Sequence, residues 1–238
     1  MRVDGRQPDE LRPITFERDF TDAPAGSVLV AFGQTRVLCT ASIDEDVPRW
    51  MKGRGKGWVT AEYSMLPGSS IERVKREVKD GRPSGRTQEI QRLIGRSVRA
   101  MLDDFKFGEF TVKLDCDVLV ADGGTRTAAI TGASVAIVDA FDWMVEMGKI
   151  AATPVKRRVA AISVGIVDGE PRLDLDYDED VRADVDMNVV MSSERKFVEV
   201  QGTGEHDTFD RAQLDQLLDL AIAGIEQLDR AQQAALGR

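Results

Sequence analysis

The chain has 238 residues and a formal net charge of −9, with 42% hydrophobic and 31% charged residues. This length and balance fit one globular domain or two fused halves and exclude a wholly disordered chain. His206 is the single histidine, so a Ser-His-Asp triad, an HExxH metalloprotease site and multi-histidine metal sites are excluded unless another chain contributes. Any chemistry must depend on Asp, Glu, Arg, Lys or the backbone.

Targeting and membrane signals are not evident in the sequence. Residues 1–13 lack the apolar centre of a signal peptide, and no stretch approaches the roughly 20 apolar residues of a membrane span. We therefore expect a cytoplasmic protein with no membrane partner. Cys39 and Cys116 each lie in a strand-like apolar run without a CxxC motif, which predicts buried, inert thiols.

The apolar pattern of the first half predicts four strands and two helices. The strands are a hairpin within 27–43 that turns at Gly33-Gln34, a third strand over 58–66 after a Gly-rich loop, and a fourth over 110–121. A long basic loop over 67–85 precedes a helix that begins near Arg86, and a buried helix covers about 127–147. Apolar spacing in the first helix turns three arginines to its exposed side, namely Arg92, Arg96 and Arg99.

The second half repeats this order in looser form. Strands are predicted over 159–167, 171–178, 185–192 and 196–202, followed by a helix from Asp210 to about Leu236. Asp210 and Gln213 resemble a capping box at the start of that helix. Strands followed by a helix, twice over, predict an α+β protein with two related halves around one core. We expect a single domain over 1–238, with an N-terminal lobe at about 10–148 and a C-terminal lobe at about 156–236.

Two junctions before helices are suited to phosphate. Asp122-Gly123-Gly124-Thr125-Arg126 follows a strand, and its glycines and the free N–H groups of the next helix suit an anion. The absence of a Walker A motif favours free phosphate or a single phosphodiester. Ser84-Gly85-Arg86-Thr87 places a second guanidinium at a helix start. Taken singly, each junction also fits a tight turn or an ordinary cap with a solvated arginine.

A cluster of carboxylates follows Leu173. Asp174, Asp176 and Asp178 are two residues apart in a strand-like run and are expected on one face. The next strand is expected to bring Asp184 and Asp186 back toward them. Clustered carboxylates suit a hard divalent cation such as Mg²⁺, whereas the alternative is a solvated acidic loop.

The charge of the chain is segregated. Residues 49–99 hold thirteen Lys and Arg against five acids, so this segment is strongly basic although the whole chain is acidic. A basic surface of this kind suits RNA, or is simply solvated. We predict that it lines a pore or its approach and that RNA affinity falls steeply with salt.

Four motifs in order resemble the ribonuclease PH family: residues 84–100, 118–133, 173–192 and 198–205. The resemblance extends from Asp4-Gly5-Arg6 to the last helix. It implies a two-lobed βα fold, like domain 2 of ribosomal protein S5, and a homohexameric ring built from three dimers. It further implies a phosphate-dependent 3′-to-5′ exoribonuclease that trims tRNA precursors, acts on RNA rather than DNA and uses Mg²⁺, or Mn²⁺, with inorganic phosphate as co-substrate.

The resemblance also implies roles for particular residues. Arg86, Gly124, Thr125 and Arg126 match the family's phosphate contacts. Asp178 and Asp184 match its metal-binding and general-acid carboxylates, with Asp180 beside them as a further catalytic candidate. Arg73 and Arg76, in a loop that is more acidic here than is usual, match positions for RNA binding or ring contacts, and Arg92, Arg96 and Arg99 are added as RNA-binding candidates.

The lack of a histidine-based catalytic motif fits phosphorolysis, because inorganic phosphate is already an anionic nucleophile at neutral pH and needs no base. The enzyme must instead hold two repelling phosphates together. A different class of function remains open, namely a non-catalytic RNA-binding subunit of a ring. Such a subunit has no physical need for both the arginine pair and the aspartate pair.

Overall fold

The N-terminal half forms a five-stranded sheet. The computed structural model describes residues 2–237, and at residues 78 and 80 it describes the backbone alone. The sheet has the strand order β1-β2-β3-β5-β4, in which only β4 and β5 pair in parallel. Its strands are β1 (Ile14–Arg18), β2 (Gly26–Phe32), β3 (Thr35–Asp44), β4 (Trp58–Met65) and β5 (Thr111–Val120). The predicted hairpin is confirmed, because Phe32 pairs with Thr35 across a two-residue turn.

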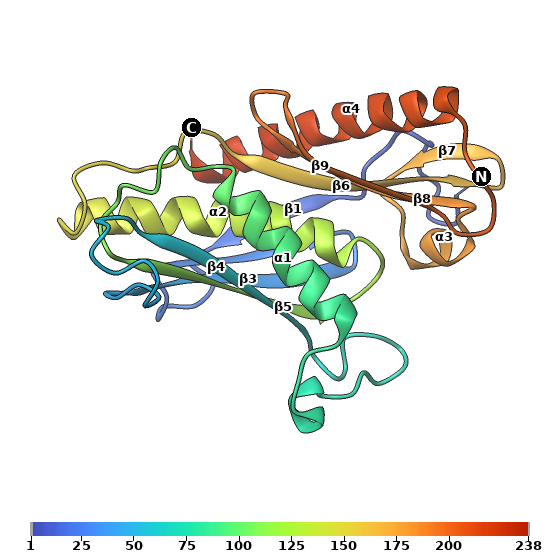
Figure 1. The fold of residues 1–238 in the computed structure, drawn as a ribbon. Coiled ribbons are helices and arrows are strands. Elements are labelled where there is room, and N and C mark those ends of the chain that lie inside the picture. Colours follow the sequence, from blue (N-terminus) through green and yellow to red (C-terminus); the bar gives the residue numbers. More distant parts are fainter. Residues whose placement is uncertain (1, 238) are drawn as a thin grey trace.

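The C-terminal half forms a four-stranded antiparallel sheet in the order β7-β6-β8-β9. Its strands are β6 (Val159–Val167), β7 (Glu170–Leu173), β8 (Val185–Ser192) and β9 (Phe197–Gly204). The helix α4 (Arg211–Leu236) covers this sheet, and the predicted capping box of Asp210 and Gln213 is present at its start (Figure 1). The predicted α+β architecture with two halves is confirmed.

The helix α2 (Thr125–Glu146) joins the two halves. It packs against β2 and β3 on one side and against β6 on the other, and Figure 1 shows it between the two sheets. One continuous cluster of buried apolar side chains therefore extends through both halves. By length and composition α2 could cross a membrane, contrary to the expectation that no stretch is so apolar, but 83% of its most apolar window is buried within the protein. This burial is that of a core helix.

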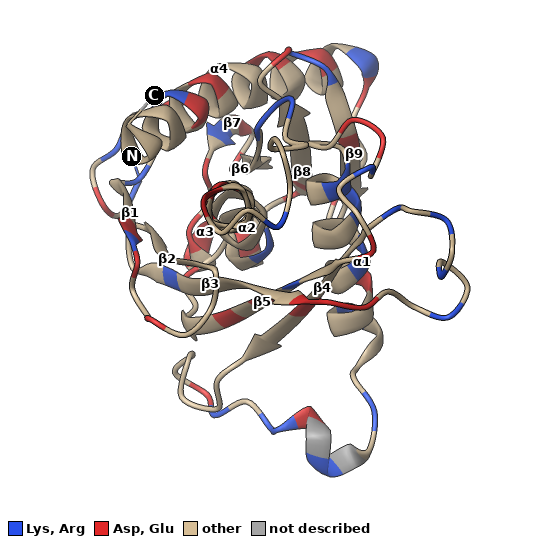
Figure 2. Ribbon diagram, turned by 90° about the vertical axis from the view of Figure 1, so that its left-hand side faces the viewer, with Lys and Arg blue, Asp and Glu red and all other residues tan. Residues whose placement is uncertain are grey.

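The helix α1 (Gly85–Arg99) packs against β4. It buries Ile90, Leu93, Ile94 and Val98, as its spacing predicts. The segment before it contains a short 3-10 helix, η1 (Glu77–Asp80), and projects from the body of the protein (Figure 1). Lys and Arg residues are distributed along this projection and the exposed side of α1 (Figure 2).

The acidic segment differs from its prediction. The strand expected over 171–178 ends at Leu173, and residues Tyr177–Arg182 form a short helix, α3. Asp174 leaves the strand in a left-handed conformation with φ of 55° and is fully buried. Asp176 caps α3 by accepting a hydrogen bond from the Glu179 amide. Because Asp174 is buried and Asp176 caps a helix, residues 174–178 do not continue the predicted strand.

The two cysteines are buried as expected. Cys39 and Cys116 face each other across the paired strands β3 and β5, and both thiols are free. The hydrogen bond with the neighbouring Cys39 thiol, together with burial, raises the pKa of Cys116, so this thiol stays protonated and unreactive.

Candidate active site

A cavity of about 1080 Å³ lies between the two halves of the chain. Its wall combines the turn before α2, the start of α1, α3 and the edge of the second sheet. The residues that carry chemistry in this wall are Arg73, Arg86, Glu89, Gly124, Thr125, Arg126, Asp180, Asp186, Asn188, Gln201, Glu205 and His206.

The turn before α2 forms one side of the cavity. Gly123 and Gly124 have φ of 71° and 65°, in the left-handed region that residues with a side chain rarely adopt. Gly124 is the N-cap of α2 and provides no side-chain cap, so the first N–H groups of the helix are available to an anion. Thr35 Oγ1 holds the turn by donating to the Gly123 carbonyl at 2.7 Å and accepting from the Asp122 amide at 2.9 Å.

Two arginines extend this anion site. Arg86 lies in the first turn of α1, where Ser84 caps the helix, and it forms no ion pair with any carboxylate whose side chain the structure describes. The Arg126 guanidinium is oriented by Gln201 Oε1 at 3.2 Å and Glu89 Oε1 at 3.5 Å. Both arginines line the cavity together with Thr125. The predicted phosphate-binding residues therefore lie together.

A tyrosine side chain, that of Tyr63, contacts the Thr125 hydroxyl. The two hydroxyl oxygens lie 2.9 Å apart, and both side chains are buried. Burial raises the pKa of Tyr63, so the phenol is neutral and able to donate to Thr125 Oγ1. A Thr125 hydroxyl that accepts from Tyr63 is free to donate its own hydrogen into the cavity.

Asp180 and Asp186 form the opposite side of the cavity. Burial raises the pKa of Asp186 to about 6, and the nearby Asp180 carboxylate adds to this effect while Arg126 opposes it. Burial likewise raises the pKa of Asp180, against the opposing charges of Arg86 and Arg126. Asp186 Oδ2 accepts from Asn188, whereas Asp186 Oδ1 is buried without a hydrogen-bond partner in the described part of the chain.

The structure places the predicted pair Asp178 and Asp184 outside the cavity wall. Asp178 and Asp180 are both exposed on α3, but because each helical residue turns by about 100°, the two face different directions and only Asp180 lines the cavity. Asp184 precedes β8, and its carbonyl oxygen accepts from the amides of Glu205, His206 and Asp207 at 2.9–3.4 Å. The cavity wall thus contains Asp180 and Asp186 in place of the expected pair Asp178 and Asp184.

The predicted RNA-binding arginines occupy three different environments. Arg73 lines the cavity, and Arg76 lies on the same exposed loop outside it. Arg92 and Arg96 line an adjacent groove of about 430 Å³ that shares Glu89 and Gln201 with the cavity, and Arg96 pairs with Glu199. Arg99 lies over the Trp58 ring at 5.0 Å and donates to the Val59 carbonyl, so it is a packing residue.

Comparisons with known proteins agree with this arrangement. Residues 10–141 match the model of the 3′ exoribonuclease family, domain 1, and residues 157–224 match domain 2 of the same family. Two relatives named ribonuclease PH are 57% identical (Corynebacterium efficiens) and 58% identical (Mycolicibacterium smegmatis). Each match covers 99% of this chain and 96% or 91% of the relative. The chain belongs to the 3′ exoribonuclease family.

Solved structures show the same fold as this 3′ exoribonuclease family member. Rice Rrp46 matches with a TM-score of 0.81 at 20% identity, over 100% of both chains. A chain of the Archaeoglobus fulgidus exosome with RNA bound to the active site matches with a TM-score of 0.79 at 21% identity. That match covers 95% of this chain and 91% of the other. The resemblance in sequence motifs is thereby confirmed at the level of family and fold.

Sequence reasoning did not assign a role to several residues of this 3′ exoribonuclease site. Tyr63, Glu89 and Gln201 orient the phosphate-binding side, and Asn188 donates to Asp186, which the sequence had already placed in the carboxylate cluster. Asp186 and Asn188 are two apart in β8 and so share one face of the strand. This alternation is visible in the sequence, but the sequence does not show which face of β8 meets the cavity.

Proposed function

We propose that the chain is a phosphate-dependent 3′-to-5′ exoribonuclease that trims the 3′ ends of tRNA precursors. It transfers the terminal nucleotide of RNA to inorganic phosphate and releases a nucleoside diphosphate. The single observation that carries this proposal is the cavity that places Arg86, Thr125 and Arg126 opposite Asp180 and Asp186. The family and the relatives named ribonuclease PH support it.

The residues of the cavity account for the main physical problem of this reaction. Two anions, inorganic phosphate and the last phosphodiester, must be held together in line. Arg86, Arg126 and the free amides at the start of α2 supply positive potential for both, and the Gln201 and Glu89 contacts fix Arg126 in advance. Fixed donors lower the barrier because they need not reorganise as charge shifts during the reaction.

The carboxylate side fits a divalent cation. Asp186 Oδ1 is buried without a hydrogen-bond partner among the described residues, and burial together with the nearby Asp180 charge raises the pKa of Asp186, so the protein neutralises the pair incompletely. No group of three or more His, Cys, Asp or Glu ligands occurs among residues 2–237. Mg²⁺ is commonly held by one or two carboxylates with water and substrate oxygens, so Asp180 and Asp186 suit Mg²⁺, or Mn²⁺. The bound cation would supply charge neutralisation at the reacting phosphoryl group.

The departing 3′ oxygen must take up a proton. Asp180 and Asp186 line the cavity together with the arginines, and burial raises the pKa of both carboxyl groups, which favours their protonated form. We therefore move the general-acid role proposed for Asp178 and Asp184 to this pair. The reverse reaction follows from the same groups, because a phosphodiester and a diphosphate are bonds of comparable energy, and excess nucleoside diphosphate would extend the RNA.

We further propose that the chain assembles as a homohexameric ring of three dimers. A ring would concentrate the basic segment 49–99 of an otherwise acidic protein around its RNA path. Light scattering coupled to size exclusion tests the mass directly: a monomer at working concentration contradicts the ring. A cytoplasmic location stays a prediction.

The test of function is product analysis on a tRNA with a short 3′ extension, incubated with Mg²⁺ with and without inorganic phosphate. Phosphate-dependent release of nucleoside diphosphates is expected. Nucleoside monophosphates formed independently of phosphate would instead show a hydrolase on this fold. Binding of RNA without any product would show the alternative, a non-catalytic subunit.

A further inference from the structure

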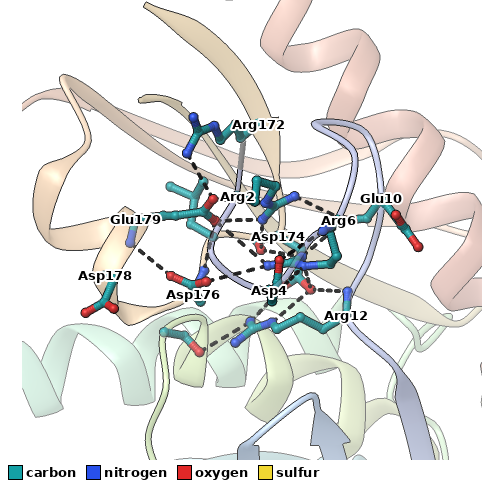
Figure 3. Close-up of polar contacts among 12 residues, drawn as sticks. Arg2, Asp4, Arg6, Glu10, Arg12, Arg172, Asp174, Asp176, Asp178 and Glu179 are labelled. Carbon is teal, nitrogen blue, oxygen red and sulfur yellow. Dashed lines mark hydrogen bonds and ion pairs between the residues drawn. The ribbon is translucent and has the colours of Figure 1, made fainter. Parts of the chain in front are cut away.

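The N-terminal segment, residues 2–12, places three arginines in the interior beside the cavity. Arg2, Arg6 and Arg12 are only 3%, 8% and 5% exposed. Figure 3 shows them converging on Asp174, Asp176 and Glu179, the acidic residues before and within α3. The proposed reaction uses none of these arginines. Buried guanidinium groups cost free energy unless they are fully paired, so their placement requires a structural reason.

Arg12 differs from the other two because its guanidinium contacts both sides of the active site. Toward the second half, its Nε and Nη2 donate to Asp174 Oδ2 at 3.0 Å and Oδ1 at 2.7 Å, and its backbone amide donates to the same carboxylate. Toward the first half, Nη1 donates to the Asp122 carbonyl, and Nη2 lies 3.5 Å from the Gly123 carbonyl. One planar group thus bridges segments about 50 residues apart.

Each side of this bridge carries functional groups. Asp122 and Gly123 begin the turn that presents Gly124, Thr125 and Arg126 to phosphate. Asp174 begins the segment in which Asp176 caps α3, the helix that presents Asp180. Arg2 holds the same helix through the Glu179 carboxylate, with Nη2 and Oε2 2.6 Å apart. The anion-binding side and the carboxylate side are therefore both fixed to one side chain.

The turn before α2 and the start of α3 are also in direct contact, so these two sides of the cavity have little room to move relative to each other. A Cβ on Gly123 would lie 2.6 Å from the Leu175 carbonyl oxygen and 2.8 Å from the Tyr177 nitrogen. A Cβ on Gly124 would lie 3.0 Å from Arg12 Nη2. The turn before α2 is packed against the start of α3, with the Arg12 guanidinium beside it. A shift of the guanidinium must displace one side relative to the other.

We propose that Arg12 is a positioning residue that fixes the separation between the phosphate-binding turn and the carboxylate pair. Arg12 is not among the residues that line the cavity. It acts by bonding at the same time to the carbonyls of Asp122 and Gly123 and to the carboxylate of Asp174. The inference rests on the proposed function, since it assigns the purpose of this bridge to the alignment of inorganic phosphate with Asp180 and Asp186.

The test is Arg12→Lys in the full-length enzyme. Lysine keeps a positive charge beside buried Asp174, but its single ammonium cannot reproduce the planar set of donors that reaches both sides. We expect kcat/KM for phosphorolysis to fall by about 10- to 100-fold, as is usual when a group that orients a site is lost. We expect a raised KM for inorganic phosphate and a lowered kcat. Without any turnover, inorganic phosphate should raise the Tm of the variant less than that of the wild type.

Arg18→Lys is the matched control. Arg18 also lies near the N-terminus and also donates twice to a buried carboxylate, that of Asp139, at 3.0 and 2.7 Å. It makes a further bond to the Ala235 carbonyl at 3.1 Å, and none of these groups lines the cavity. Arg18→Lys should lower Tm and leave the KM for phosphate and the phosphate-induced rise in Tm unchanged.

The outcomes separate the inference from a merely structural role. If Arg12→Lys lowers Tm as Arg18→Lys does, with kcat, phosphate KM and the phosphate-induced rise in Tm all retained, the proposal is overturned. If Arg12→Lys does not fold, the pair Arg12→Gln with Asp174→Asn removes both buried charges and is measured instead, and normal kinetics in that pair overturn the proposal. Failure of the proposed function is seen separately, as a wild-type enzyme that releases no nucleoside diphosphate.

Discussion

The substitution Asp186→Asn should affect stability and activity in opposite directions. It should stabilise the folded protein at neutral pH and abolish phosphorolysis. Asp186 is held in a cavity where burial and the Asp180 charge favour its neutral form, so its pKa is about 6 instead of 3.8. The folded protein therefore binds more protons than the unfolded chain between about pH 3.8 and pH 6. The contribution of Asp186 to the free energy of unfolding is most favourable below pH 3.8, and it is lost as the pH rises through 6. Asp186→Asn removes this penalty.

The magnitude follows from the size of the shift. One pKa unit corresponds to about 1.4 kcal/mol, so the change from 3.8 to about 6 gives a destabilisation on the order of 3 kcal/mol at neutral pH. In a chain of this length, relief of that penalty would raise Tm by about 5–10 °C. The gain should be present at pH 7 and absent near pH 4, where wild-type Asp186 is already mostly neutral. Phosphorolysis should meanwhile be lost.

The assay is thermal unfolding at pH 4 and pH 7, each with and without Mg²⁺. Mg²⁺ should stabilise the wild type at pH 7, because the cation relieves the same repulsion, and should stabilise Asp186→Asn much less. Asp178→Asn is the matched control, since Asp178 is exposed and lies outside the cavity wall. An Asp178→Asn enzyme that loses Mg²⁺ stabilisation, beside an Asp186→Asn enzyme that keeps it, would refute the corrected carboxylate pair.

Three further predictions concern the opposite side of the cavity and the basic surface. Arg126→Ala should lower the phosphorolysis rate by about 10²–10³-fold, and a near-normal rate would remove Arg126 from the site. Tyr63→Phe, which deletes the hydroxyl that contacts Thr125, should raise the KM for phosphate with a loss of about 1 kcal/mol in unfolding free energy, measured by denaturant titration. RNA affinity should fall steeply with salt, and Arg73→Ala should reduce the slope of log affinity against log salt by about 1. Filter binding at several salt concentrations would show a flat line if the basic surface does not contact RNA.

The local elements were predictable because their signals lie within short windows of sequence. Gly33 marks the hairpin turn, the spacing of Ile90, Leu93, Ile94 and Val98 marks α1, and Asp210 with Gln213 marks the start of α4. The two junctions proposed to bind phosphate are visible in the sequence for the same reason, since a glycine turn and the helix that follows it are contiguous in sequence.

The carboxylate pair could not be assigned in this way. Alternation over 171–178 indicated a strand, but Asp174 is buried against Arg12, 162 residues earlier in the chain, and turns the backbone into the left-handed region. Its pairing ends β7 and allows Asp176 to cap α3. A helix in place of a strand then directs Asp180, and not Asp178, into the cavity.

The sequence by itself determined the two α+β halves, the position of the two glycine-containing junctions before helices, and the exclusion of a Ser-His-Asp triad or multi-histidine site within one chain. These follow from hydrophobic period, turn residues and composition, which act over a few neighbouring residues. Only the tertiary structure decided which carboxylates face the arginines and which arginine joins the two sides. Those choices depend on burial and on charge pairs between segments far apart in the chain, and such energies exist only after the chain has folded.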